Sequence, residues 1–147
     1  MKQINIKAFV NSYLETAAWA DIEPGENKEF TREAKKTALA DCLKFIEAVK
    51  AKFGEPEAVR LLTIPGTDLD YLAPHCFYLN RNGHGSGFWD REIEFEEAAN
   101  TLSDISKGMG SSQAIHIRGP TYIWLNNYKI TSYETNRKSL KTRFDPI

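Results

Sequence analysis

Three glycines alternate with a histidine and a serine in one short segment, RNGHGSGFWDR, at residues 81–91. Glycine buries no side chain and loses much conformational freedom on ordering, so such a run is typical of backbone that takes positive φ or approaches another group closely. Successive backbone N–H groups left free by glycines form a concave anion site, and arginine adds charge-assisted hydrogen bonds to a phosphate. The segment therefore predicts a ligand-binding loop made of Arg81, Asn82, Gly83, His84, Gly85, Trp89 and Arg91.

Histidine is the side chain most often used for proton transfer near neutral pH, so His84 is the candidate general acid or base of this loop. Ser86 and Asp90 are the other candidate catalytic residues, because a serine nucleophile needs a base and that base needs an orienting carboxylate. The spacing matches neither a Walker phosphate loop, which ends in Gly-Lys-Ser/Thr, nor a dinucleotide-binding fingerprint. The catalytic residues therefore remain unassigned from the sequence.

The same loop has a structural interpretation that needs no ligand. Asn82-Gly83 favours the tight turn of a β-hairpin, after which Phe88 and Trp89 return to the core. Both interpretations remain open at this stage.

The histidines and cysteines do not predict a metal site or a cofactor. His75, His84 and His116 lack a short ligand spacing such as H-x-x-x-H or C-x-x-C. Cys42 and Cys76 are too few for a secreted disulfide scaffold, so we expect two reduced, partly buried thiols. A bridge between them depends on geometry that the sequence does not give.

The C-terminal region combines aromatic with basic side chains, the combination that holds single-stranded nucleic acid. The candidate residues are Trp124, Tyr128, Lys138 and Arg143. The competing interpretation places the aromatic residues in the core. Because 19 Lys and Arg balance 20 Asp and Glu, for a net charge of -1, the composition excludes a strongly basic nucleic-acid binder.

Helical spacing of apolar residues dominates the first half of the chain. It predicts helices over residues 4–19 and 31–53, the second capped by Thr31 and ended by Gly54. Residues 56–62 predict a short helix, or alternatively a strand over 59–64.

Further along the chain the pattern favours strands. Residues 75–80 are predicted to form a strand before the glycine-rich turn, and residues 93–105 a helix after it. Residues 114–118 and 121–125, separated by Gly119-Pro120, predict two more strands.

This order predicts an α+β fold: N-terminal helices packed on a small antiparallel sheet, a helix after the glycine-rich hairpin, and a C-terminal β-hairpin. With 147 residues, we expect one domain over residues 1–133 and a polar, mobile tail over 134–147. The apolar run near the N-terminus is interrupted by polar residues, and no stretch approaches the roughly 20 apolar residues of a membrane span. We therefore expect a cytoplasmic protein with no membrane partner.

The run CFYLNRNGHGSGFWDR, at residues 76–91, resembles a pattern shared by small uncharacterised proteins of tailed phages and prophages. That pattern is an aromatic-rich strand, then T-R-N-G-H-G-x-G-F-W-D-R, then an amphipathic helix. The likeness extends more loosely over about residues 8–109. Asn80 replaces the usual threonine, and the C-terminal part is longer and richer in strand signals. The resemblance implies a phage context but no established activity, so it assigns no catalytic role.

These observations favour a small non-enzymatic accessory protein of a phage or mobile element, located in the host cytoplasm. It would bind a host or defence protein, or sequester a small phosphorylated ligand, through the loop at 81–91. One alternative is an enzyme on a phosphorylated or nucleotide substrate that uses the His84 loop. A second alternative, not favoured, is a module that binds single-stranded nucleic acid.

Overall fold

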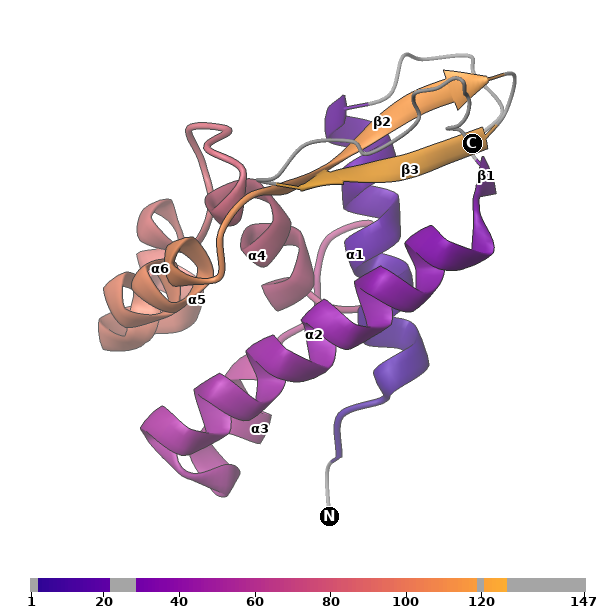
Figure 1. Ribbon diagram of the computed structural model, residues 1–147. Coiled ribbons are helices and arrows are strands. Elements are labelled where there is room, and N and C mark those ends of the chain that lie inside the picture. The colour runs from indigo at the N-terminus through magenta and orange to yellow at the C-terminus, as the bar shows by residue number, and fades with distance from the viewer. Residues whose placement is uncertain (1–2, 22–28, 119–120, 127–147) are drawn as a thin grey trace.

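The computed structural model describes residues 3–21, 29–118 and 121–126 of the chain (Figure 1). Its helices are α1 (Ile6–Asp21), α2 (Arg32–Phe53), α3 (Glu55–Leu62), α4 (Ala73–Arg81), α5 (Glu92–Phe95) and α6 (Ala99–Gly108). Two short 3-10 helices, η1 (Phe88–Asp90) and η2 (Glu96–Ala98), lie on either side of α5. The strands are β1 (Glu29–Phe30), β2 (Ser112–Arg118) and β3 (Thr121–Asn126).

The strands lie at one end of the helices in Figure 1, in the order β1-β3-β2. β2 runs antiparallel to β3, whereas the two residues of β1 pair with β3 in parallel. This is a mixed arrangement at the edge of a helical body.

The predicted α+β class, with helices packed on an antiparallel sheet, is wrong: the chain is mostly helical. Among the described residues, the buried hydrophobic side chains belong to helices, with the exception of Leu72 just before α4. The helices therefore bury their apolar faces against one another, and the core does not need a sheet beneath them.

The predicted strand at residues 75–80 is the central error, because this segment forms α4. Pro74 lies in the first turn of α4, where a missing backbone N–H costs nothing. Almost every side chain of α4 is buried, so the segment lacks the polar face that reveals a helix. A short, continuously apolar run cannot be assigned to helix or strand by periodicity alone.

The segment after α4 also differs from its prediction. The glycine-rich residues connect α4 to η1 and not two strands of a hairpin. The helix predicted over 93–105 is divided into α5, η2 and α6, with a break at Glu96, where φ is +56°.

The helix predicted over 31–53 is confirmed as α2. The Thr31 hydroxyl accepts a hydrogen bond from the Ala34 N–H at 3.0 Å, which caps the first turn. Gly54 ends the helix with φ +85°, and its N–H donates to the Lys50 carbonyl at 2.8 Å. The short helix expected at 56–62 is confirmed as α3, and the alternative strand there is wrong.

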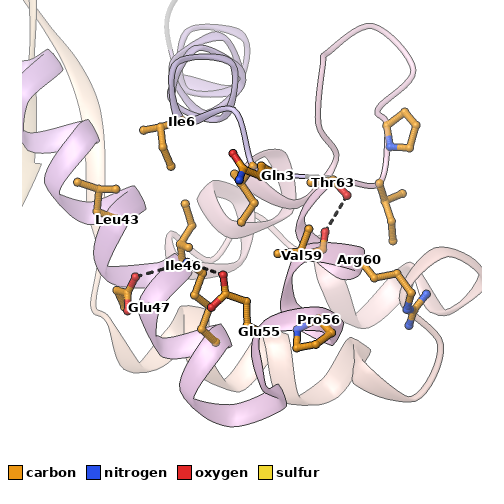
Figure 2. A pocket seen from close by; sticks show the side chains of 14 residues that line it. Gln3, Ile6, Leu43, Ile46, Glu47, Glu55, Pro56, Val59, Arg60 and Thr63 are labelled. Atoms are coloured by element: carbon orange, nitrogen blue, oxygen red, sulfur yellow. Dashed lines mark hydrogen bonds and ion pairs between the residues drawn. The ribbon is translucent and has the colours of Figure 1, made fainter. Parts of the chain in front are cut away.

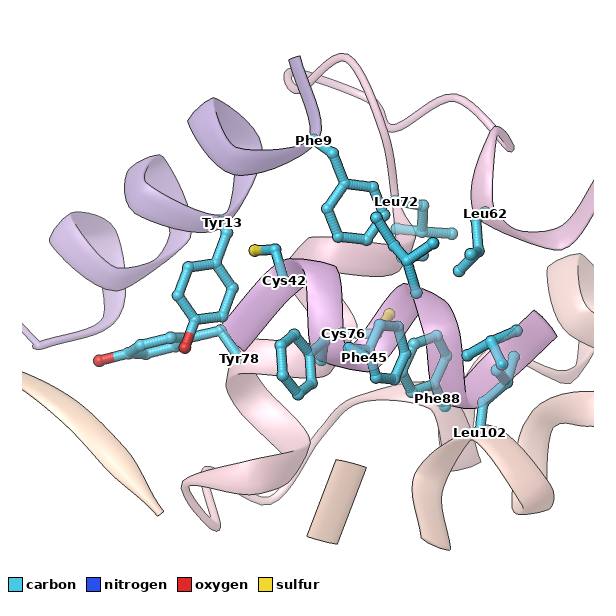
Figure 3. Close-up of a cluster of buried hydrophobic side chains, with 14 of the residues drawn as sticks. Phe9, Tyr13, Cys42, Phe45, Leu62, Leu72, Cys76, Tyr78, Phe88 and Leu102 are labelled. Carbon is cyan, nitrogen blue, oxygen red and sulfur yellow. The ribbon is translucent and has the colours of Figure 1, made fainter. Parts of the chain in front are cut away.

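The core centres on a group of stacked aromatic rings (Figure 3). Phe45 of α2 stacks on Phe77 of α4, with ring centroids 4.2 Å apart and an interplanar angle of 13°. Tyr13 of α1 packs on Phe77 at 5.3 Å, and Phe88 of η1 packs on Phe45 at 5.9 Å. These contacts fix α4 between α1 and α2, and so they fix the position of every side chain that α4 presents.

Cys42 and Cys76 are free and buried in this core, which confirms the expectation of two thiols. Burial raises the pKa of the Cys76 thiol to about 12, so the thiol stays protonated at neutral pH. The predicted tail at 134–147 lies outside the described residues. In the described ranges, no helix combines the length and apolar character needed to cross a membrane.

Candidate functional site

The glycine-rich segment begins as the C-terminal end of α4. The Gly83 N–H donates to the Asn80 carbonyl at 3.4 Å, and the His84 N–H donates to the Leu79 carbonyl at 3.1 Å. Gly83 and Gly85 have φ of +68° and +78°, the left-handed conformation that commonly ends a helix. The first part of the loop therefore satisfies the last carbonyls of α4.

The third glycine is explained by close approach to a buried amide. The Asn80 side-chain oxygen accepts from the Phe88 N–H at 2.7 Å, while the Gly87 N–H donates to Asp90 at 3.1 Å. A Cβ at Gly87 would lie 2.3 Å from that Asn80 oxygen. The backbone N–H groups of residues 83, 84, 87 and 88 thus donate hydrogen bonds within the chain. They are not available to form the anion site that was predicted for this loop.

This packing predicts that Gly87→Ala destabilises the protein much more than Gly83→Ala. Both positions have positive φ, but only the new methyl at 87 would collide with Asn80. We expect about 2–3 kcal/mol for Gly87→Ala from strain and overpacking, against about 1 kcal/mol for Gly83→Ala. Urea unfolding of the two variants measures the difference. Equal losses would show that Gly87 is required only for its φ.

Arg81 is buried, with only 4% of its side chain exposed, and it points into the helical body. Its guanidinium donates to the Asp41 carboxylate at 2.8 Å and to the Tyr13 hydroxyl at 3.1 Å. It also donates to the carbonyls of Gly110 at 2.7 Å and Met109 at 3.2 Å. Arg81 therefore ties α4 to α1, to α2 and to the end of α6, and its donors are not directed at a surface ligand.

Asn82 has a similar structural role between α4 and β2. Its amide nitrogen donates to the Tyr78 carbonyl at 3.0 Å and to the Ser112 carbonyl at 3.3 Å. Its oxygen accepts from the Ser111 hydroxyl at 2.9 Å and from the Ser112 N–H at 2.8 Å. Two of the residues predicted to bind a ligand thus hold the fold together.

The candidate catalytic residues divide between two places. His84 lies 3.2 Å from the Asp21 carboxylate at the end of α1, and its ring is nearly parallel to that of Tyr78. The Tyr78 hydroxyl donates to the same carboxylate. Ser86 and Asp90 instead line a small cavity beside His75. The structure does not bring Ser86 and Asp90 to His84 in any contact that it describes.

Two cavities meet at His75 and Arg91. The smaller, of about 240 Å³, extends toward η1 and α5 and includes Ser86, Asp90 and Glu94 in its lining. The larger, of about 490 Å³, extends toward α1 and the 66–69 segment. Both share His75 from α4 and Arg91 from the start of α5.

The His75 ring is held in one tautomer. Its Nδ1 lies 3.1 Å from the hydroxyl oxygen of Thr16, a buried residue of α1. Thr16 donates its single hydroxyl proton to the Ser12 carbonyl at 2.9 Å, so its oxygen accepts from His75. Nδ1 therefore carries the proton, and Nε2 is left as an acceptor.

Burial lowers the pKa of His75 below its ordinary value, and the positive charge of Arg91 lowers it further, while Asp90 acts in the opposite direction. The imidazole is consequently neutral at pH 7. This agrees with the tautomer that Thr16 imposes.

Exposed apolar side chains border the two cavities. Trp19, 69% exposed, lines the larger cavity with its ring centroid 5.8 Å from that of His75. Ile93, 92% exposed, lines the smaller one. We call the area formed by Trp19, His75, Arg91 and Ile93 the His75 surface.

Of this surface, the sequence predicted Arg91 alone. Trp19 is a large apolar residue that lies off the buried face of its helix. This position was the one feature of the sequence that could have indicated an exposed binding residue. His75 and Trp19 are far apart in the sequence, so their contact depends on the packing of α4 against α1. The remaining loop candidate, Trp89, is 45% exposed.

A larger apolar groove of about 980 Å³ lies where α1 begins, between α2 and α3 (Figure 2). Several of its polar groups are bonded to one another: Lys50 pairs with Glu47 and Glu55, and the Thr63 hydroxyl donates to the Val59 carbonyl. A ligand site ordinarily presents a few convergent polar groups to its ligand. The groove offers mainly volume and apolar surface.

The remaining candidates concern nucleic acid and metal. Tyr128, Lys138 and Arg143 lie outside the described residues, and of Trp124 only the backbone pairing with Ala114 is described. Within the described part of the chain, no three His, Cys, Asp or Glu side chains are placed to hold a metal ion.

The lowered pKa of His75 predicts an acid-sensitive fold. Because the folded pKa lies below the ordinary 6.5, the unfolded chain binds the proton more readily. The free energy of unfolding should therefore have its full value above about pH 6.5, and it should decrease as the pH falls toward the pKa of His75 in the folded protein. Urea unfolding of the wild type and of His75→Gln, measured from about pH 7.5 to about pH 5, tests this expectation. The variant should show a smaller decrease, and parallel curves would exclude His75 as the cause.

No protein-family model matches this chain, and neither the curated proteins nor the solved structures include a significantly similar one.

Proposed function

We propose that this is a small, non-enzymatic binding protein that recognises a protein partner through the His75 surface. The observation that carries the proposal is the position of Trp19 and Ile93. Single exposed apolar residues are ordinary. Here the two most exposed of the large apolar side chains in the described ranges both border cavities that share His75 and Arg91.

The composition of this surface supports a protein partner. Tryptophan and arginine are enriched among the residues that dominate binding energy at protein interfaces. The helices that carry Trp19 and His75 are fixed by the aromatic core, so the surface is formed before binding. Such preorganisation reduces the entropy that binding must overcome.

The resemblance of residues 76–91 to phage proteins supports the wider context. On that ground we propose that the protein is an accessory protein of a phage or mobile element, that it acts in the cytoplasm of the host cell, and that its partner is a host or defence protein. A small phosphorylated ligand has less support. Arg81 is buried against Asp41, and Arg91 lies 3.8 Å from Glu94.

Capture from a bacterial lysate tests the proposal. The immobilised wild type is compared with a Trp19→Ala, Ile93→Ser double variant and with a matched Leu39→Ala, Leu43→Ala control, whose two leucines are exposed on α2. We expect at least one protein that the wild type and the control retain and that the surface variant loses. An identical set of captured proteins for all three would remove the His75 surface as the binding site.

The contact between His84 and Asp21 favours a second candidate, the enzyme on a phosphorylated or nucleotide substrate. A carboxylate that orients one ring nitrogen leaves the other for proton transfer. Screening for phosphoesterase and nuclease activity tests this candidate. Turnover that His84→Ala abolishes in a folded protein would support it, and absence of turnover in the wild type would exclude it.

A further inference from the structure

The polar groups around the His75 surface are mainly hydrogen-bond acceptors. Glu15 and Asp68 line the larger cavity, and Asp90 and Glu94 line the smaller one. Among the described lining residues, these four carboxylates face a single guanidinium, that of Arg91. The cavities therefore carry an excess of negative charge although the whole chain is nearly neutral.

Arg91 does not reverse this balance. Its Nη1 lies 3.8 Å from the Glu94 carboxylate, and its side chain is 40% exposed. Part of its charge is thus compensated within the chain. A negatively charged group entering the cavities would meet the remaining carboxylates.

His75 adds an acceptor with a fixed direction. Thr16 holds the proton on Nδ1, so Nε2 presents a lone pair. In the described part of the chain, no residue donates a hydrogen bond to Nε2. The exposed indole of Trp19 lies beside the same ring and supplies an aromatic face.

We propose that the protein partner binds by inserting an arginine side chain from a basic segment beside Trp19, with the guanidinium donating to His75 Nε2. This inference rests on the proposed function and names the chemistry of the partner. A guanidinium is planar, carries only donors and stacks on aromatic rings, and each of these properties matches a feature of the cavity. Glu15 and Asp68 would add long-range attraction, and would repel an acidic segment.

Titration with short peptides, followed by NMR, tests this chemistry without the partner. Three peptides differ only at the central residue: arginine, citrulline or glutamate. Citrulline keeps the shape of arginine but has no charge. At millimolar concentration the arginine peptide should shift the indole signal of Trp19 and the ring nitrogen signals of His75. It should bind at least about tenfold more tightly than the citrulline peptide.

Variants locate the effect. Trp19→Ala should abolish the shift at His75, whereas the control Leu39→Ala should leave it unchanged. Thr16→Val removes the acceptor of Nδ1, so Thr16 acts as a positioning residue. The nitrogen signals of His75 should then report a mixture of tautomers, and the arginine peptide should bind several-fold more weakly. An unchanged tautomer with unchanged affinity would contradict the role given to His75.

The outcomes separate this inference from the proposed function. If no peptide shifts these signals, or if citrulline or glutamate binds as well as arginine, the inference is overturned. In that case a partner that the Trp19 and Ile93 variant fails to capture still supports the His75 surface as an interface. If capture is insensitive to that surface, the proposed function itself is excluded.

Discussion

Replacing Arg81 with methionine should destabilise the folded protein by about 3 kcal/mol or more. The substitution removes the hydrogen bonds that Arg81 donates to Asp41, to the Tyr13 hydroxyl and to the carbonyls of Met109 and Gly110. A charge left inside a protein without its partner carries a large desolvation penalty. The Asp41 side chain is 23% exposed and can partly regain water, which places the expected loss near the lower end of the range for buried pairs.

Urea unfolding measures this effect, with Arg60→Met as the matched control. Arg60 pairs with Glu57 at the surface, where both side chains are about half exposed, so its loss should change stability by less than about 0.5 kcal/mol. Arg81→Lys should be intermediate, because lysine keeps the charge but cannot reproduce the fork of donors. If Arg81→Met unfolded at the wild-type urea concentration, Arg81 would be free for a ligand, and the structural role assigned to it would be wrong.

Replacing Trp19 with alanine should weaken binding of the captured partner by about 30-fold, equivalent to about 2 kcal/mol. Removing a tryptophan at the centre of an interface gives up a large contact area and leaves partner groups unpaired. Because Trp19 is 69% exposed, the same change should alter the free energy of unfolding by less than about 0.5 kcal/mol. Calorimetric titration of the purified partner, alongside urea unfolding of the variant, measures both quantities.

Leu43→Ala is the matched control for this affinity, since Leu43 is an exposed apolar residue on a different face of the helical body. It should bind the partner as the wild type does. A Trp19→Ala variant that keeps its affinity would remove the principal contact from the proposed surface. A variant that loses both affinity and stability would show that Trp19 is structural.

Helices with one buried face were predictable from the sequence, and α2 shows why. Ala38, Cys42, Phe45 and Val49 repeat on one side, and all are buried. A hydroxyl before the first turn and a glycine after the last mark the ends independently. Local chemistry and packing therefore indicate the same element.

The central helix α4 was not predictable, because a helix buried on nearly every side has no polar face and therefore no helical hydrophobic pattern. α4 packs against α1, α3, α6 and η1, and Phe77 also stacks on Phe45 of α2, so the helix needs apolar side chains on nearly every face. A strand buried on both faces has the same composition. The choice between them depends on the neighbours, and the sequence of the segment alone does not show which neighbours it has.

For the candidate site too, the sequence indicated local features but not contacts between distant elements. The glycine spacing correctly indicated unusual backbone, but the cause at Gly87 is Asn80 beneath it and not a ligand above it. Arg81 was predicted to bind a ligand, but it is buried against Asp41, which comes from a distant helix that the local sequence pattern does not indicate. His75 and Trp19 come into contact only when α1 and α4 pack together, so the sequence alone does not place them in one surface.

NMR cross-saturation from the bound partner to the amides of this protein tests the central claim most directly. If the His75 surface is the interface, saturation should concentrate at residues 15–19, 66–69 and 91–94, which contribute to the two cavities or border them. Saturation confined to residues 82–85 would contradict the account, because it would place the partner on the part of the glycine-rich turn that lines neither cavity.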